Sequence, residues 1–345
     1  PWIAPRPDHE ACEKFPKNSG FFLRLLPANG GESFRTHVSL PQAGQEICAT
    51  PCFLGNVQTV STSQERHLPR VHSLARRQHA PAMLVQLTDS HLFGEPDTAM
   101  LGVNTDASLR AVLRQIEADG KHPDLLMATG DLSQDGEAAS YRRFAAILGE
   151  SEALARAQIR CLPGNHDQPA VLRQELPQWS APVTDVGAWR VVALDTTVPG
   201  SNAGHLPDSQ LDMLESALAD APGRHTLIAM HHNPMQIDSH WHDSMMIDNP
   251  QALFKRLARF PQARVLLWGH VHHEFDRRRH NLRMLATPST CFQFSIRDGK
   301  HVVDNMAPGY RWIKLYEDGS MATGVRRVQD ALWHTALAPD DAQAA

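Results

Sequence analysis

Side chains that can bind metals and move protons follow five short apolar runs of the chain. They stand at Asp89-x-His91, Gly130-Asp131, Gly164-Asn165-His166-Asp167, His231-His232 and Gly269-His270-Val271-His272. Carboxylate, amide and imidazole donors without thiolates favour Mn²⁺, Fe or Zn²⁺ over a structural zinc site built from cysteines. A single Asp-x-His pair is more often a capped turn or a hydrogen-bonded pair. Five such groups in order, each directly after an apolar run, indicate a common site.

The size of this donor set indicates two metal ions. Two carboxylates, one amide and four imidazoles are more ligands than one ion with an open position accepts. Two ions that share a bridging carboxylate would use the whole set. Such a pair activates a water molecule near neutral pH and neutralises the oxygens of a phosphoryl group under attack. The donor set therefore predicts a dinuclear centre suited to hydrolysis at phosphorus.

The apolar runs before these groups have the length of buried strands. We predict strands at 83–88, 124–130, 159–164, 189–195, 225–230 and 264–269. Amphipathic stretches between them predict helices at 107–118, 137–148, 208–219 and 250–260. The last helix has Asn249 as candidate N-cap and Pro250 at its first position. This alternation indicates a largely parallel α/β sheet, whose strands open at their carboxyl ends on one crevice.

Three later segments have only short connections and predict a further, mostly antiparallel set of strands. They are residues 282–287, 311–316 and 321–328. Together with the alternating part of the chain, they lead us to expect two sheets flanked by helices.

The composition is that of a globular protein, with 42% hydrophobic and 21% charged residues among 345. Histidine is unusually frequent, with 20 residues. The net charge of −5 gives no general attraction to nucleic acid or anionic lipid. No apolar run reaches the roughly 18 residues of a membrane span. The five cysteines are scattered, which favours a reducing compartment. We therefore expect a cytoplasmic protein with neither nucleic acid nor a membrane as partner.

The chain changes character near residue 82. All eleven methionines lie from Met83 onward, and residues 1–82 show no sustained period of 2 or 3.6 residues. We expect residues 1–82 to be a poorly ordered leader or sequence upstream of the native start, with a small folded appendage as the alternative. Residues 83–328 would form the catalytic domain and residues 329–345 a C-terminal tail.

The five motifs together resemble the motif set of the calcineurin-like metallophosphoesterases, over most of residues 83–328. Flanking segments resemble the bacterial class III 3′,5′-cyclic AMP phosphodiesterases. They are QLTDSHLF (86–93), LGVNTDASL (101–109), ATGDLSQDG (128–136), WHDSMMIDN (241–249), LATPSTCFQF (285–294) and APGYRW (307–312). The resemblance implies a four-layer α/β/β/α sandwich of two mixed sheets flanked by helices. It also implies hydrolysis of 3′,5′-cyclic AMP to 5′-AMP by a metal-bound hydroxide, on two divalent or mixed-valence ions (Fe, Mn or Zn).

The family pattern assigns a role to each motif position. Asp89, His91 and His272 would hold the first ion, Asp131 would bridge, and Asn165, His231 and His270 would complete the second. The bound phosphate would lie against His91, Asp131, Asn165, His166 and His272. His166 would stabilise or protonate the leaving 3′-oxygen.

Three further residues are expected to support this site. Asp167 would orient His166. His231 is preferred as the ligand because in relatives the histidine directly after the strand binds the metal, which leaves His232 to stand behind the ligands. Asp135 either orients a ligand or caps a helix just before Glu137, and the sequence does not separate these alternatives.

Some positions depart from the family pattern. Asn233 and His273 replace residues that are usually histidine and glutamine, and His240 and His242 are unusual in a loop that borders the nucleotide. The base preference is therefore open, and 2′,3′-cyclic nucleotides or glycerophosphodiesters are alternative substrates. A non-catalytic scaffold on the same fold is the remaining alternative. The protein serine/threonine phosphatases of the superfamily carry an arginine after the second aspartate of the Gly-Asp motif. Here Asp135 is followed by glycine, which argues against that branch.

Overall fold

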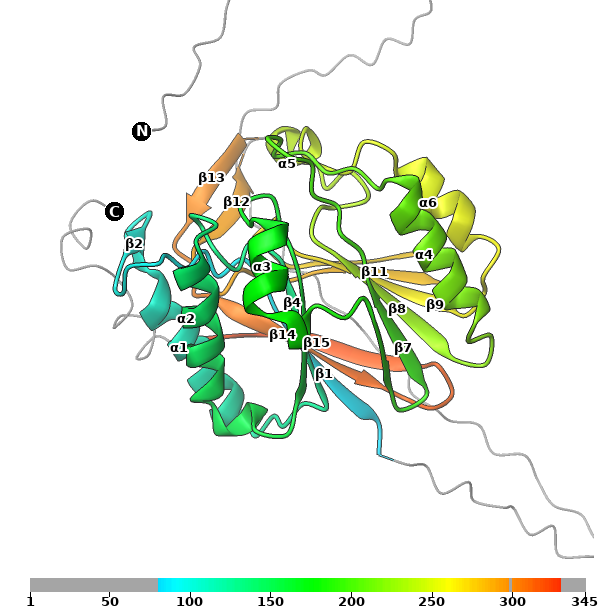
Figure 1. Ribbon diagram of the computed structural model, residues 1–345, viewed down its shortest axis with the longest axis horizontal. Helices are drawn as coiled ribbons and strands as arrows, with labels where there is room; N and C mark the ends of the chain where they lie inside the picture. The colour runs from blue at the N-terminus through cyan, green and yellow to red at the C-terminus, as the bar shows by residue number, and fades with distance from the viewer. Residues whose placement is uncertain (1–79, 298–299, 330–345) are drawn as a thin grey trace, which may run out of the picture. The chain divides into compact units, whose positions relative to one another are not determined.

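The computed structural model describes residues 80–297 and 300–329, which form two principal sheets (Figure 1). The first sheet has five strands in the order β15-β14-β1-β4-β5. Their bounds are β1 Ala82–Leu87, β4 Leu125–Thr129, β5 Gln158–Leu162, β14 Gly309–Leu315 and β15 Met321–Arg327. β1, β4 and β5 are parallel to one another, whereas β14 runs antiparallel to both β1 and β15. The sheet is therefore mixed.

The second sheet has six strands in the order β10-β11-β9-β8-β7-β6. Their bounds are β6 Val183–Val186, β7 Trp189–Ala193, β8 His225–Met230, β9 Ala263–Trp268, β10 Phe275–Arg279 and β11 Leu282–Ala286. β7, β8, β9 and β11 are parallel, and the two edge strands are antiparallel to their neighbours. This sheet is also mixed, as expected.

The three later segments do not form a separate set, although β14 and β15 pair antiparallel as expected. The segment predicted at 282–287 is β11, which pairs in parallel with β9 in the second sheet. The segments at 311–316 and 321–328 are β14 and β15, which extend the first sheet instead. A short connection places two strands near each other in sequence but does not fix which neighbours they pair with: β11 pairs with β9 and β14 with β1.

Three apolar clusters separate four layers. The first packs the outer face of the first sheet against α1 Thr105–Ala118, α2 Ala138–Gly149 and α3 Pro169–Glu175. The second packs the other sheet against α4 Asp208–Ala219 and α6 Pro250–Leu257. The third lies between the sheets and joins β1, β4, β5 and β14 to β7, β8, β9 and β11. The α/β/β/α sandwich is therefore confirmed, with the helices on the two outer sides (Figure 1).

Alternation along the strands explains why the apolar runs have no polar face. On β9, Val265 and Leu267 point into the layer between the sheets, whereas Leu266 and Trp268 contact the helix side. A strand covered on both faces needs apolar residues at every position. The same covering makes the carboxyl ends of these strands the first places where polar side chains can stand.

The short elements were not predicted from the sequence. They comprise the hairpins β2 Ala99–Met100 with β3 Val103–Asn104 and β12 Gln293–Arg297 with β13 Lys300–Asp304, the edge strands β6 and β10, the helices α3 and α5 His240–Asp243, and the 3₁₀ turns η1 Glu152–Leu154 and η2 Pro177–Trp179. Those of two to four residues are too short to show a period.

Asn249 precedes α6 as predicted, and Pro250 occupies the first helical position. The Asn249 side chain does not cap the helix. Its Oδ1 accepts a hydrogen bond from the Leu206 N–H at 3.0 Å, and its Nδ2 donates to the Leu206 carbonyl at 2.8 Å. Asn249 therefore joins the start of α6 to the segment before α4.

Residues 1–79 of the expected leader and residues 330–345 of the expected tail lie outside the described part of the chain. The division at residues 82 and 328 therefore stays a prediction. Among the described residues, no helix is both long and apolar enough to cross a membrane.

Candidate metal centre

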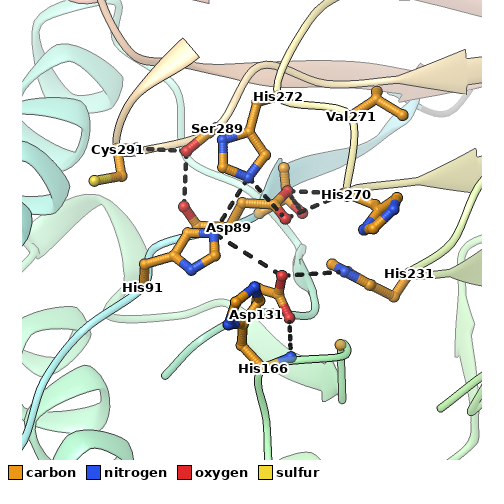
Figure 2. Close-up of polar contacts among 12 residues, drawn as sticks. Asp89, His91, Asp131, His166, His231, His270, Val271, His272, Ser289 and Cys291 are labelled. Carbon is orange, nitrogen blue, oxygen red and sulfur yellow. Dashed lines mark hydrogen bonds and ion pairs between the residues drawn. The ribbon is translucent and has the colours of Figure 1, made fainter. Parts of the chain in front are cut away.

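The predicted metal ligands come together at the carboxyl ends of strands from both sheets (Figure 2). The first sheet supplies the residues that follow β1, β4 and β5, which are Asp89, His91, Asp131, Asn165 and His166. The second sheet supplies those that follow β8 and β9, which are His231, His232, His270 and His272. The ligands therefore meet at one edge, as expected, but two sheets share it, because the layer between them brings their carboxyl ends together.

The backbone is strained where it delivers these side chains. Left-handed φ angles occur at Asp89 (55°), His91 (47°), Asp131 (50°), His270 (68°) and His272 (50°). Residues other than glycine rarely adopt this conformation, which costs roughly 1–3 kcal/mol each and clusters at functional sites. The strain turns each side chain sharply out of its strand and toward the centre.

Two motif glycines are required by close packing at the same place. A Cβ atom on Gly130, whose φ is +93°, would overlap the ring of His231. A Cβ atom on Gly164 would overlap the carboxylate of Asp131. The pairs Gly-Asp and Gly-Asn thus arise because the chain passes directly beneath the ligands.

Three of the histidines share one hydrogen-bonding pattern. The Nδ1 atom of His231 lies 2.8 Å from the Thr129 carbonyl, and that of His272 lies 2.9 Å from the Phe292 carbonyl. The Nδ1 atom of His91 lies 2.8 Å from Oε1 of Gln134. Because these oxygens only accept, each Nδ1 must carry a proton and donate it. The Nε2 atoms are thereby turned toward the centre, as for histidines that bind metals.

The Nε2 atoms face carboxylates and one another. His272 Nε2 lies 3.4 Å from Asp89 Oδ1, and 3.2 Å from His91 Nε2. Neutral rings at His91 and His272 would set two nitrogen lone pairs against each other, an arrangement that a shared cation stabilises. Asp89, His91 and His272 each offer a ligand atom, all within 4.8 Å of one another. These residues therefore fit the first metal ion.

Asp131 lies between the two groups of ligands. Its Oδ2 atom is 3.9 Å from His91 Nε2 and 3.3 Å from His231 Nε2. His231 Nε2 also lies 3.1 Å from Oδ1 of Asn165. Asp131 can thus reach both groups, which suits a bridging carboxylate, and the direction of the His231 ring toward Asn165 supports the preference for His231 over His232.

Burial and neighbouring charges set the protonation of these donors. Burial raises the pKa of Asp89 and Asp131, but the imidazoles of His272 and His231 outweigh it and hold both pKa values below the usual range. Burial lowers the pKa of His91 to about 3, so its Nε2 lone pair is available at neutral pH. Although burial opposes it, Asp131 raises the pKa of His231 to about 9. A metal ion that takes the His231 nitrogen must therefore displace a proton.

His166 stands at the open side of the centre. It is half-buried, and its backbone N–H donates to Oδ1 of Asp131 at 2.9 Å. Its ring lies edge-on to that of His91, with 5.0 Å between centroids. This position, close to the predicted ligands without sharing their hydrogen-bonding pattern, is consistent with a group that faces the substrate.

Asp167 has contacts other than those expected. Its Oδ2 accepts from the N–H groups of Gly164 (2.8 Å) and Leu132 (3.2 Å), and its Oδ1 accepts from that of Ser133 (3.0 Å). Burial, with the nearby Asp131 charge, raises the pKa of Asp167 to about 7. The expectation that Asp167 orients the His166 ring is corrected: backbone donors occupy its carboxylate, which ties the Asp131 loop to the Asn165 loop.

Asp135 is held at the start of α2. Its Oδ1 accepts from Ser133 Oγ at 2.8 Å, from the Glu137 N–H at 3.0 Å and from Ser140 Oγ, and its Oδ2 accepts from the Gly94 N–H at 2.8 Å. These bonds favour the second of the two alternatives, in which Asp135 supports the start of the helix, although the N-cap residue of α2 is Glu137. They also connect the loop after β1 to the loop after β4.

The hydrogen-bond partners behind the ligands had no signature in the sequence. Thr129 and Phe292 act through backbone carbonyls, which any residue has, and Ser289 donates to the carbonyl of Asp89 at 2.7 Å. Gln134 and Thr196 act through side chains, but only the fold brings them near His91 and His232. None of these five residues was predicted.

A row of aromatic rings borders the first group of ligands. The ring centroid of Phe292 is 4.6 Å from that of His272 and 5.3 Å from that of His91. Phe294 lies 4.9 Å from His272, and Trp241 on α5 lies 5.7 Å from Phe294. Trp241 is 46% exposed. The row therefore leads from the metal ligands to the exposed indole of Trp241 on α5.

A family model described as calcineurin-like phosphoesterase matches residues 83–274, and the chain belongs to this family. Its donor set, with imidazoles and carboxylates from both sheets, is compatible with two metal ions. Among curated proteins, it is 46% identical to the 3′,5′-cyclic adenosine monophosphate phosphodiesterase CpdA of Pseudomonas aeruginosa, over 76% of this chain and 96% of the relative. It is 41% identical to CpdA of Escherichia coli strain K12, over 76% of this chain and 94% of the relative.

A solved dimetal phosphatase from Danio rerio has the same fold, with a TM-score of 0.54 and 14% sequence identity. The match covers 73% of this chain and 98% of that one.

Proposed function

We propose that this protein is a dinuclear-metal phosphodiesterase that hydrolyses 3′,5′-cyclic AMP to 5′-AMP and so lowers the intracellular cyclic AMP concentration. The observation that carries the proposal is the complete donor set at five strand ends, and relatives named as cyclic AMP phosphodiesterases match this chain over nearly their whole length. The proposed substrate is a small molecule, and the proposed location is the cytoplasm. The complete donor set speaks against a scaffold that has lost catalysis.

The residues fit two cations. Asp89, His91 and His272 would hold one, Asn165, His231 and His270 the other, and Asp131 would bridge them. The oxygen and imidazole donors suit Fe, Mn or Zn. When bound, such ions lower the pKa of a shared water and neutralise the phosphate oxygens.

His166 would act on the leaving group. Attack of water oxygen on phosphorus breaks the bond to the 3′-oxygen, which leaves as an alkoxide and needs a proton. His166 lies beside the Asp131 carboxylate and the His91 ring, and its imidazole could donate that proton or a hydrogen bond. The oxygen atom of the attacking water stays bonded to phosphorus, so the product is a 5′-phosphate with a free 3′-hydroxyl.

The aromatic row gives the nucleobase a place to lie. A base attached to a phosphate on the first group of ligands could stack on the exposed indole of Trp241, which is linked to His272 through Phe294.

The test is a comparison of kcat/KM for 3′,5′-cyclic AMP, 2′,3′-cyclic AMP and a glycerophosphodiester on metal-loaded protein. We expect 3′,5′-cyclic AMP to be preferred. A clear preference for either of the other substrates would replace this proposal by the corresponding alternative, and no turnover of any of them would favour the scaffold.

A further inference from the structure

One histidine of the metal centre lacks the support that the others have. His91, His231 and His272 each donate Nδ1–H to an oxygen 2.8–2.9 Å away, which fixes the tautomer and the ring direction. The backbone N–H of His270 donates to the Asp89 carboxylate. Its ring nitrogen Nε2 is buried and has no hydrogen-bond partner among the described residues. A metal-binding histidine almost always has such a partner for its second nitrogen.

His232 has a matching deficit. Its side chain is buried, its ring centroid is 4.9 Å from that of His270, and the two planes meet at 50°. Its Nδ1 lies 2.7 Å from Oγ1 of Thr196, whereas its Nε2 is buried without a hydrogen-bond partner in the described part of the chain. His231, His232 and His270 each place one ring nitrogen within 4.8 Å of the others, so a direct bond from His232 to a metal ion is the alternative to a supporting role.

We propose that His232 is a positioning residue for the second metal ion, an inference that rests on the proposed dinuclear centre. His270 donates Nε2–H to Nε2 of His232, and His232 donates Nδ1–H to Thr196 Oγ1. Both rings are then neutral, each buried nitrogen has a partner, and Nδ1 of His270 keeps its lone pair for the metal.

The arrangement also accounts for the two consecutive histidines after β8. His231 turns toward Asp131 and Asn165, whereas His232 turns toward Thr196, which follows β7. The two rings lie edge-on to each other with 5.0 Å between centroids, yet they reach different partners. One histidine can therefore bind the metal while its neighbour supports a ligand from β9.

The experiment measures binding of Mn²⁺ to metal-free full-length protein by calorimetry, with stoichiometry and affinity determined for each site. We expect His232→Leu to lower the affinity for the second ion by roughly 10- to 100-fold, while two ions still bind at saturating metal. His232→Gln should restore affinity to within a few-fold of the wild type, because its amide oxygen replaces Nε2 as acceptor. Thr196→Val should give a smaller loss, and the exposed His122→Gln should give none.

Several outcomes would overturn the inference. His232→Leu could bind both ions as tightly as the wild type, or His232→Gln could bind no better than His232→Leu. A drop to one ion at saturation would make His232 a ligand. An equal loss in His242→Leu, with none in His232→Leu, would transfer the role to His242, whose ring lies 5.9 Å from that of His270. Wild-type protein that fails to bind two ions would overturn the proposed function and this inference together.

Discussion

The two sheets supply the metal centre with different chemistry. The strand ends of the first sheet carry all its carboxylate and amide donors, Asp89, Asp131 and Asn165, whereas those of the second carry only imidazoles. Carboxylates bring charge and can bridge two ions, and imidazoles bring directed nitrogen lone pairs. Neither sheet alone presents a complete ligand set. The site therefore exists only when the two sheets are held in register.

Hydrogen bonds between the two sheets, across the boundary that we call the seam, help to hold that register. Gln86 on β1 donates from Nε2 to the Trp268 carbonyl on β9 at 3.0 Å, and to Thr129 Oγ1 on β4 at 2.7 Å. Arg311 on β14 donates to the Ala286 carbonyl on β11 at 2.7 Å. Gln86 lies three residues before Asp89, and Trp268 two residues before His270. These bonds thus act close to the ligands of both sheets.

The largest effect should follow from removing the carboxylate that links the two groups of ligands. We expect Asp131→Asn to lower kcat/KM on the order of 10⁴-fold, because it affects both proposed ions at once. Metal content and turnover, measured together, check this. The exposed Asp208→Asn on α4 is the matched control. Retention of activity within ten-fold would show that the sheets do not share a bridging ligand.

His166→Ala should separate catalysis from metal binding. We expect both ions to be retained and kcat to fall by about 10²–10⁴-fold, since His166 serves the leaving oxygen and not the metals. Metal analysis and steady-state kinetics measure the two parts separately. Unchanged turnover would remove His166 from the mechanism.

Trp241→Ala tests the contribution of the second sheet's side to substrate binding. Loss of base stacking, worth about 1–3 kcal/mol, should raise KM for 3′,5′-cyclic AMP by roughly 5- to 150-fold, with kcat nearly unchanged. Trp241→Phe should recover most of the affinity. If KM were the same in all three proteins, the base would have to bind elsewhere.

Gln86→Leu tests the bonds across the seam. It leaves the buried Trp268 carbonyl without its donor, and we expect the free energy of unfolding to fall by about 1–3 kcal/mol. Urea unfolding of the metal-free protein measures this. A parallel fall in metal affinity would show that the bonds between the two sheets also position the ligands. An unchanged midpoint would mean that the apolar layer alone holds the sheets.

The smallest effect is expected at Asp135. Its bonds hold the start of α2, so Asp135→Ala should lower the free energy of unfolding by about 1 kcal/mol and leave kcat/KM within a few-fold. Thermal unfolding and kinetics check this. Loss of a metal ion would instead restore the alternative in which Asp135 orients a ligand.

The sequence by itself determined the donor set and most of the strands. Asp89, Asp131, Asn165, His231 and His270 each follow an apolar run too short for a helix, and such runs mark strands buried on both faces. The strand ends were therefore predictable to within one or two residues, together with the groups that stand there.

Only the tertiary structure decided how the donors divide between two sheets and what supports them. Nδ1 of His231 and His272 is held by backbone carbonyls, and a carbonyl has no signature in a sequence. Asp167 ties two loops together instead of orienting His166, because its carboxylate accepts hydrogen bonds from the backbone N–H groups of Gly164, Leu132 and Ser133. Residue types state which groups can bind a metal, whereas their partners depend on contacts between segments far apart in the chain.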